Sequence, residues 1–167
     1  GAPMRFFVKP TDVGFADKSD TFFTWDFTVA APASEAFDAL TDPARFMRWF
    51  PDAKRVAWVT DAPHGAGSVR DVALRGITVR EKVLVWEPGR RFSFTVVESS
   101  LPLLWRMVED FRFSSAGRET RVEWTIAYQP RLLVRPLERA LKPLISRTFR
   151  VACDRLRRHL ANGSQQG

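Results

Sequence analysis

The chain has 167 residues, enough for a single domain with a full hydrophobic core. Its 26 Lys and Arg residues outnumber its 19 Asp and Glu residues by seven, and 14 Phe and 6 Trp form a heavy aromatic load that favours a large, aromatic-lined interior. A single Cys excludes an internal disulfide bond, and one Cys with two His argues against a transition-metal site.

The start of the chain predicts no targeting or membrane segment. There is no run of about 18 apolar residues, the length that a transmembrane helix requires, and no apolar stretch typical of a signal peptide. We therefore expect a soluble cytoplasmic protein. Residues 1–3, Gly-Ala-Pro before Met4, look like an expression scar, and residues 4–20 have no hydrophobic period, so we expect residues 1–20 to form an irregular arm.

Residues 21–30 are aromatic and β-branched, which predicts the first strand. Two short helices follow, one over residues 35–40 and one that begins at Asp42-Pro43 and stops before Pro51. Six more strands are predicted over residues 55–60, 68–74, 77–87, 91–97, 103–114 and 120–128. The turns between most of them are short, so neighbouring strands should be antiparallel.

The last predicted element is a long amphipathic helix over residues 131–161, bent where Pro143 interrupts its hydrogen bonds. Apolar or small residues recur there at steps of three and four, the period of one helix face. The other face is basic, with nine Lys or Arg residues against two acidic ones. Asn162-Gly163 predicts the end of this helix, and residues 162–167 a C-terminal tail. Residues 21–161 should therefore form one domain.

Four motifs resemble those of a known superfamily. They are Val-Ala-Ala-Pro-Ala-Ser-Glu-Ala-Phe at 29–37, Asp-Pro-Ala-Arg-Phe-Met-Arg-Trp-Phe at 42–50, the Gly-Ala-Gly turn at 65–67, and Trp-Glu-Pro-Gly-Arg-Arg-Phe-Ser-Phe at 86–94. With the order of the elements, they resemble the START/Bet v1-like (SRPBCC) superfamily, in particular its polyketide cyclase/dehydrase-like branch, over about residues 20–161.

The resemblance implies an α+β helix-grip fold. In that fold a curved antiparallel seven-stranded sheet wraps around the long C-terminal helix, and an apolar cavity lies between them. The two short helices after the first strand would form part of the cavity mouth. Members of the superfamily include carriers of hydrophobic ligands, ring cyclases and chaperone activators, so the resemblance implies no single activity.

Two carboxylates interrupt strand faces that are otherwise apolar. Side chains alternate along a strand, and on this pattern Glu81 and Glu109 point inward with apolar neighbours. Desolvation would raise their pKa values into the range useful for proton transfer, which makes them the candidate catalytic residues. Alternatively, each is paired with an arginine and only completes the sheet. The candidate partners are Arg80, Arg106, Arg112 and Arg155.

The candidate ligand-binding residues combine inward-facing side chains of the strands, the short helices and the long helix. They are Phe46, Trp49, Phe50, Asp71, Phe94, Trp105, Met107, Phe111, Trp124, Ile126, Thr148, Ala152 and Arg155. Thr148 and Ala152 are small and would leave room opposite the aromatic side chains, while Arg155 leans toward the apolar side and could meet a polar end of the ligand. Alternatively, the aromatic set is plain core and Arg155 extends to solvent.

The leading hypothesis is that the protein binds, and transports or sequesters, a hydrophobic small molecule such as a lipid, isoprenoid, quinone or polyketide. The first alternative is an aromatase/cyclase-type enzyme in which Glu81, Glu109 and Asp71 move protons. The second is a protein-binding module related to chaperone activators. The basic helix face is either solvated or contacts an anionic membrane surface. No nucleic-acid motif, nucleotide loop or nucleophile elbow is present, so we expect neither nucleic acid nor cofactor.

Overall fold

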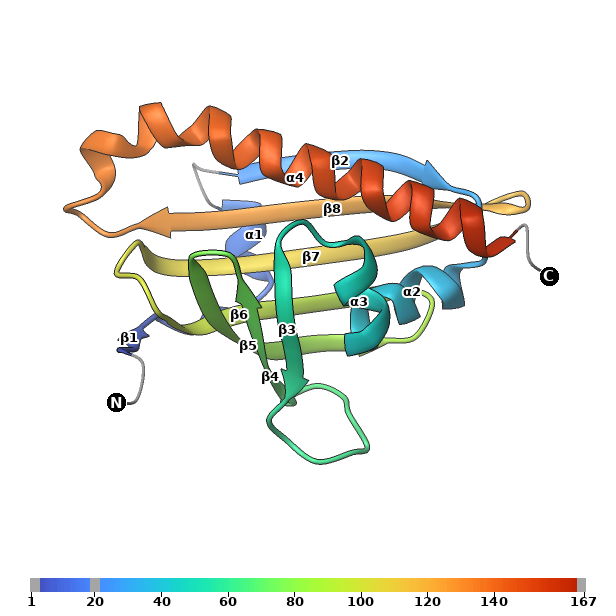
Figure 1. Cartoon of the computed structure of the whole chain (residues 1–167), viewed down its shortest axis with the longest axis horizontal. Coiled ribbons are helices and arrows are strands. Elements are labelled where there is room, and N and C mark those ends of the chain that lie inside the picture. The colour runs from blue at the N-terminus through green and yellow to red at the C-terminus, as the bar shows by residue number, and fades with distance from the viewer. Residues whose placement is uncertain (1–3, 19–21, 165–167) are drawn as a thin grey trace.

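The computed structural model describes residues 4–18 and 22–164 and has the predicted α+β helix-grip architecture (Figure 1). The expression scar predicted at residues 1–3 lies outside the described residues. The strands are β1 (Phe6–Phe7), β2 (Phe22–Val29), β3 (Ala53–Trp58), β4 (Val69–Leu74), β5 (Ile77–Glu87), β6 (Arg91–Ser99), β7 (Leu104–Ala116) and β8 (Glu119–Pro130). The helices are α1 (Gly14–Lys18), α2 (Ala33–Thr41), α3 (Pro43–Trp49) and α4 (Arg135–Ser164).

The strands form one antiparallel sheet in the order β2-β8-β7-β6-β5-β4-β3. The seven predicted strands correspond to β2 through β8. Consecutive strands from β4 to β8 are joined by short connections, two of which contain Gly76 and Gly117 at φ values of 90° and 69°, whereas residues 59–68 form a longer loop between β3 and β4. Only glycine adopts this backbone conformation without steric cost, which explains the residue at both turns.

The two short helices connect the opposite edge strands, β2 and β3. Asp42 separates them: its side chain accepts a hydrogen bond of 3.1 Å from the Ala44 backbone N–H, and Pro43 occupies the first position of α3. The indole Nε1 of Trp49 donates a 2.8 Å hydrogen bond to the Ala39 carbonyl and so ties α3 to α2. Within this unit Phe46 and Phe50 stack on each other with ring centres 4.8 Å apart.

Helix α4 lies along β2 and crosses the concave side of the sheet (Figure 1). It continues through Pro143, begins four residues after the predicted start and runs past Asn162-Gly163 to Ser164. The predicted stop at residue 162 is therefore wrong, because the helix includes Gly163. No helix within residues 4–18 and 22–164 combines the length and apolar composition that a membrane span requires.

The N-terminal segment is more regular than the sequence predicts. β1 pairs antiparallel with the end of β6, and the backbone N–H groups of Val8 and Lys9 donate to Val97 and Trp105 respectively. Val8 is fully buried, and α1 packs against β7 and β8. The prediction of an irregular arm is therefore wrong for these residues. Backbone hydrogen bonds to β6 and β7 order them, and a segment this short shows no hydrophobic period in its sequence.

Candidate ligand-binding cavity

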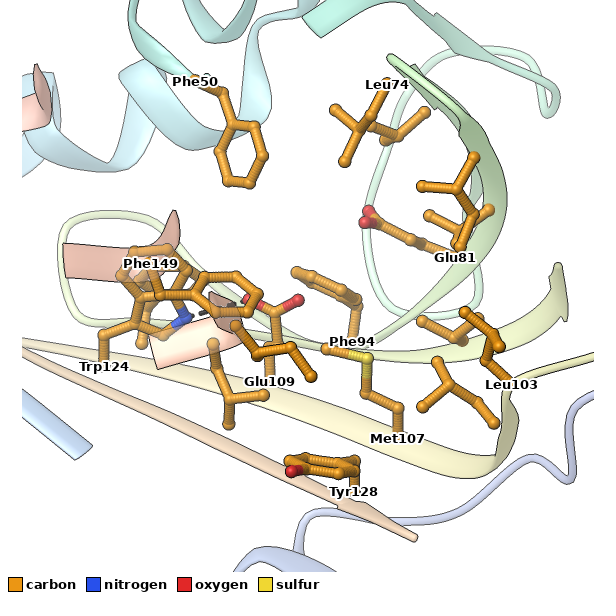
Figure 2. A pocket seen from close by; sticks show the side chains of 18 of the residues that line it. Phe50, Leu74, Glu81, Phe94, Leu103, Met107, Glu109, Trp124, Tyr128 and Phe149 are labelled. Carbon is orange, nitrogen blue, oxygen red and sulfur yellow. Dashed lines mark hydrogen bonds between the residues drawn. The ribbon is translucent and has the colours of Figure 1, made fainter. Parts of the chain in front are cut away.

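A cavity of about 290 Å³ lies between the sheet and the first half of α4 (Figure 2). Strands β4 to β8 form its walls, and α3 contributes aromatic side chains. Helix α4 contributes residues from Glu138 to Phe149, and Val134 lines the cavity directly before this helix. Almost all of the lining side chains are apolar or aromatic. A space of this size far exceeds the voids left by normal core packing and approaches the volume of small-molecule sites.

The cavity reaches the surface at one end. Leu103 lines it and is exposed, and the neighbouring lining residues Pro130, Val134 and Leu141 are only half-buried. Leu104 and Pro130 are paired across the ends of β7 and β8, directly before α4 begins. A ligand could therefore enter between this end of the sheet and the first turns of α4.

A buried ion pair lies in the wall formed by β4 and β5. Arg70 and Glu81 are cross-strand partners, and the Arg70 Nε donates a 2.6 Å hydrogen bond to the Glu81 Oε2. The Arg70 Nη1 donates a second bond of 2.6 Å to the Leu40 carbonyl at the end of α2. The guanidinium carbon also lies 5.1 Å from the ring centre of Phe46, and the side chain is 1% exposed. These contacts replace the water that a buried guanidinium loses.

Glu109 on β7 projects into the same space (Figure 2). The indole Nε1 of Trp124, on the adjacent strand β8, donates a 2.9 Å hydrogen bond to the Glu109 Oε1. Trp124 is itself fixed by stacking on Phe111, with ring centres 4.7 Å apart, and by an edge contact with Phe149 of α4. The Glu109 carboxyl is thus held in one orientation by a rigid aromatic cluster.

Burial affects both carboxyl groups. It raises the pKa of Glu109 to about 8, and repulsion from Glu81 adds to this rise. Burial also raises the pKa of Glu81, while the adjacent Arg70 guanidinium opposes that rise. A guanidinium does not lose its proton, and an unpaired one would be costly in this interior, so we assign the anionic form to Glu81 and the neutral form to Glu109 at pH 7.

The family follows from comparison with known proteins. A family model described as polyketide cyclase / dehydrase and lipid transport matches residues 21–161. The chain belongs to this family. The resemblance found in the sequence is therefore confirmed, and the family description covers both ligand carriage and cyclase-type chemistry.

Individual similar proteins support the fold. The uncharacterized protein Rv2574 of Mycobacterium tuberculosis is 29% identical over 148 residues, which cover 88% of this chain and 89% of the relative. A START superfamily protein from Mycobacterium smegmatis has a TM-score of 0.71 at 14% identity, over 84% of this chain and 97% of that one. The ZhuI aromatase/cyclase from Streptomyces sp. R1128 has a TM-score of 0.68 at 16% identity, over 81% of this chain and 90% of that one.

Ten of the residues proposed from the sequence line the cavity of this family member. They are Phe46, Trp49, Phe50, Glu81, Phe94, Met107, Glu109, Phe111, Trp124 and Ile126. Both candidate catalytic carboxylates are among them and project into a common space. The other five residues, Asp71, Trp105, Thr148, Ala152 and Arg155, are not part of the lining.

Asp71 was placed on the wrong face of its strand. Arg70, Val72 and Leu74 line the cavity, so the alternation of β4 directs Asp71 to the opposite face. There it accepts hydrogen bonds of 2.8 and 3.0 Å from Arg80. The apolar pattern did not identify the inward face of this strand, because the first residue on that face is an arginine.

Trp105 is not part of the cavity lining because β7 is irregular at its start. The register with β8 shifts between Leu104 and Arg106, which breaks the simple alternation. Leu104 and Met107 both line the cavity, whereas Trp105 packs against Phe7 with ring centres 6.3 Å apart. A bulge of this kind leaves no signal in a pattern of apolar residues.

The predicted inward face of α4 is correct for most of its members, but Thr148 and Arg155 were wrongly assigned to it. Ile145 and Phe149 line the cavity, and the same face continues through the buried Leu156. Thr148 and Arg155 each lie one position, or about 100°, away from this face and are exposed. Ala152 is buried, but it lies beyond the end of the cavity. The proposal that Arg155 meets the ligand is therefore wrong.

Sequence reasoning missed Arg70, the partner of Glu81. The arginines considered as partners are used elsewhere: Arg80 pairs with Asp71, Arg112 with Asp110, and Arg106 donates to Gln129, while Arg155 is exposed. The available signal was the short hairpin of β4 and β5, whose register places residues 70 and 81 opposite each other.

Proposed function

We propose that this protein binds a hydrophobic small molecule in the cavity and transports or sequesters it. The observation that carries the proposal is the apolar cavity of about 290 Å³, which opens to the surface between the ends of β7 and β8 and the start of α4. Filling such a space with an apolar ligand removes both surfaces from water, which stabilises the complex. The family description, which includes lipid transport, supports the same proposal.

Adjacent residues of α4 provide a test of this proposal. Ile145 lines the cavity, whereas Leu144 is exposed on the other side of the same turn. Ile145→Trp should fill part of the cavity and weaken the binding of an apolar fluorescent probe at least about tenfold, while Leu144→Trp should leave the affinity unchanged. Equal affinities of the two variants for the probe would contradict the proposal.

Residues 132–144, which lead into α4 and form its first turns, carry an apolar surface beside the cavity mouth. Leu132, Leu133, Leu137 and Leu144 are 74%, 92%, 58% and 61% exposed. Residues 131–144 also contain four basic residues and only one acidic residue. Val134 and Leu141 of the same stretch line the cavity. We propose that this surface docks on an anionic lipid bilayer, where leucines enter the interface and basic side chains meet the headgroups.

Replacing Leu137 and Leu144 with serine should reduce binding to vesicles of about three parts phosphatidylcholine and one part phosphatidylglycerol at least tenfold. Binding of the unchanged protein should weaken between about 0.1 M and about 0.5 M salt, because basic side chains contribute to it. Val151→Ser, at an exposed position farther along α4, is the matched control and should bind normally. Undiminished vesicle binding by the double variant would refute this docking surface.

A cyclase-type enzyme is the second candidate function. The observation that favours it is the pair of buried carboxyls, Glu81 and Glu109, one held as an anion and the other with a pKa of about 8. A carboxyl group with such a pKa can donate a proton to a carbonyl near neutral pH. In an enzyme, Glu109→Gln would keep ligand binding and abolish turnover of a poly-carbonyl substrate. In a carrier the same substitution would change the ligand affinity by no more than a few fold and would leave the identity of the bound ligand unchanged.

A further inference from the structure

The charges in the cavity restrict which ligand it accepts. Among the described lining residues, Arg70 is the one cation, and four other side chains can titrate. These are Glu81, Glu109, Glu138 and Tyr128. Resting on the proposed ligand-binding function, we infer that the cavity selects uncharged ligands with a carbonyl group, which accepts a hydrogen bond from the Glu109 carboxyl, and that it rejects carboxylates and phosphates.

Arg70 does not offer an anion site. Its Nε donates to Glu81 and its Nη1 to the Leu40 carbonyl, both at 2.6 Å, and four aromatic rings lie within 5.1–5.7 Å of its guanidinium carbon. A ligand carboxylate would have to compete with Glu81 for this cation, and any weakening of the pair would leave Glu81 as a poorly compensated buried anion. The ion pair therefore cancels the charge that would otherwise attract an anionic headgroup.

Glu109 supplies the hydrogen-bond donor. Its Oε1 accepts the indole N–H of Trp124, so the proton of the neutral carboxyl resides on the other oxygen, Oε2. No hydrogen bond to Oε2 is found within the described ranges 4–18 and 22–164, and the carboxyl projects into the open space (Figure 2). A ketone, aldehyde or ester oxygen placed there would complete its hydrogen bonding.

The surroundings of Glu109 disfavour a second negative charge. Glu81 faces the same space from β5, and Glu138 lines the cavity from α4. The apolar walls offer no further cation to an anionic ligand. A fatty acid would therefore have to bind in its protonated form, which at about pH 7 is roughly one molecule in several hundred.

The test compares decan-2-one with decanoate, two apolar chains that differ in charge at the head. Titrations that follow the fluorescence of the cavity tryptophans should give an affinity for the ketone at least about 100-fold higher at about pH 7. The affinity for decanoate should rise roughly tenfold per unit as the pH falls from about 7 to about 5, since the neutral acid becomes available. Similar affinities at pH 7, or no rise with acid, would overturn the inference.

Two variants assign the selectivity to particular side chains. Glu81→Gln removes the charge that cancels Arg70 and should raise the affinity for decanoate at least about tenfold at pH 7. Asp26→Asn, which removes a carboxylate partner of the exposed Arg121 outside the cavity, is the control and should change nothing. Glu109→Leu should bind the ketone about three- to tenfold more weakly and leave the affinity for decane unchanged.

The outcomes separate this inference from the proposed function. Tight binding of decanoate to the unchanged protein would overturn the selectivity and leave the ligand-binding function intact. Binding of neither probe would overturn the proposed function and this inference with it. The comparison of the two probes uses the unchanged protein. It therefore tests the inference even if Glu81→Gln fails to fold.

Discussion

Replacing Arg70 with methionine is expected to lower the free energy of unfolding by about 3–5 kcal/mol. The variant leaves Glu81 in the apolar wall without its 2.6 Å hydrogen-bond partner, and the Leu40 carbonyl loses its donor as well. Breaking a buried ion pair from one side is costly because the remaining charge is neither solvated nor paired. Urea unfolding followed by tryptophan fluorescence would measure the change.

Two further variants show whether the unpaired charge causes this loss. Arg121→Met breaks the exposed ion pair with Asp26 and should cost far less stability, because water solvates both groups. Adding Glu81→Leu to Arg70→Met removes both charges from the cavity wall and should recover most of the stability, since apolar replacement of a whole buried pair is often neutral. Equal losses in Arg70→Met and Arg121→Met would contradict the role assigned to the buried pair.

Glu109 is expected to make the protein less stable as the pH rises. The folded protein holds the Glu109 proton up to a pKa of about 8, whereas the unfolded chain releases it near the ordinary value of 4.5. The folded state therefore binds more protons between these values, and the free energy of unfolding falls as the pH increases. From about pH 5 to about pH 9 this contribution amounts to about 4 kcal/mol.

Glu109→Gln should remove this dependence. The difference in free energy of unfolding between the variant and the unchanged protein should increase in favour of the variant by about 4 kcal/mol over the same pH interval. Contributions of groups common to both proteins, such as His159, cancel in this difference. Glu119→Gln, at an exposed glutamate, serves as the control and should show a constant difference. A constant difference for Glu109→Gln would mean that Glu109 is ionised in the folded protein.

The fold was largely predictable because its signals are local. The periodicity of apolar residues along the chain indicates the antiparallel strands with their short turns, the two helices after the first strand and the long amphipathic helix. The inward faces of β8, of residues 77–83 in β5 and of residues 92–96 in β6 alternate, so Glu81, Phe94 and Trp124 were placed on the correct side. Glu109 was correctly placed as well because β7 regains a regular register after its irregular start.

The errors in the site have a different origin. Arg70 was missed because an arginine on an inward face contradicts the hydrophobic pattern unless its cross-strand partner is known, and that partner depends on the register between β4 and β5. Trp105 was misplaced by a bulge, which changes the phase of a strand without changing its composition. Arg155 was misplaced because an offset of one residue rotates a helical side chain by about 100°.

We expect an uncharged apolar ligand to occupy the cavity with its carbonyl oxygen at Glu109. The most direct measurement is a crystal structure with an alkan-2-one that carries bromine at its far end, because anomalous scattering locates the bromine independently of the chain. We expect bromine inside the cavity and the ketone oxygen within hydrogen-bond distance of Glu109 Oε2. Bromine bound only at the exposed surface, with the cavity empty at saturating ligand, would contradict it.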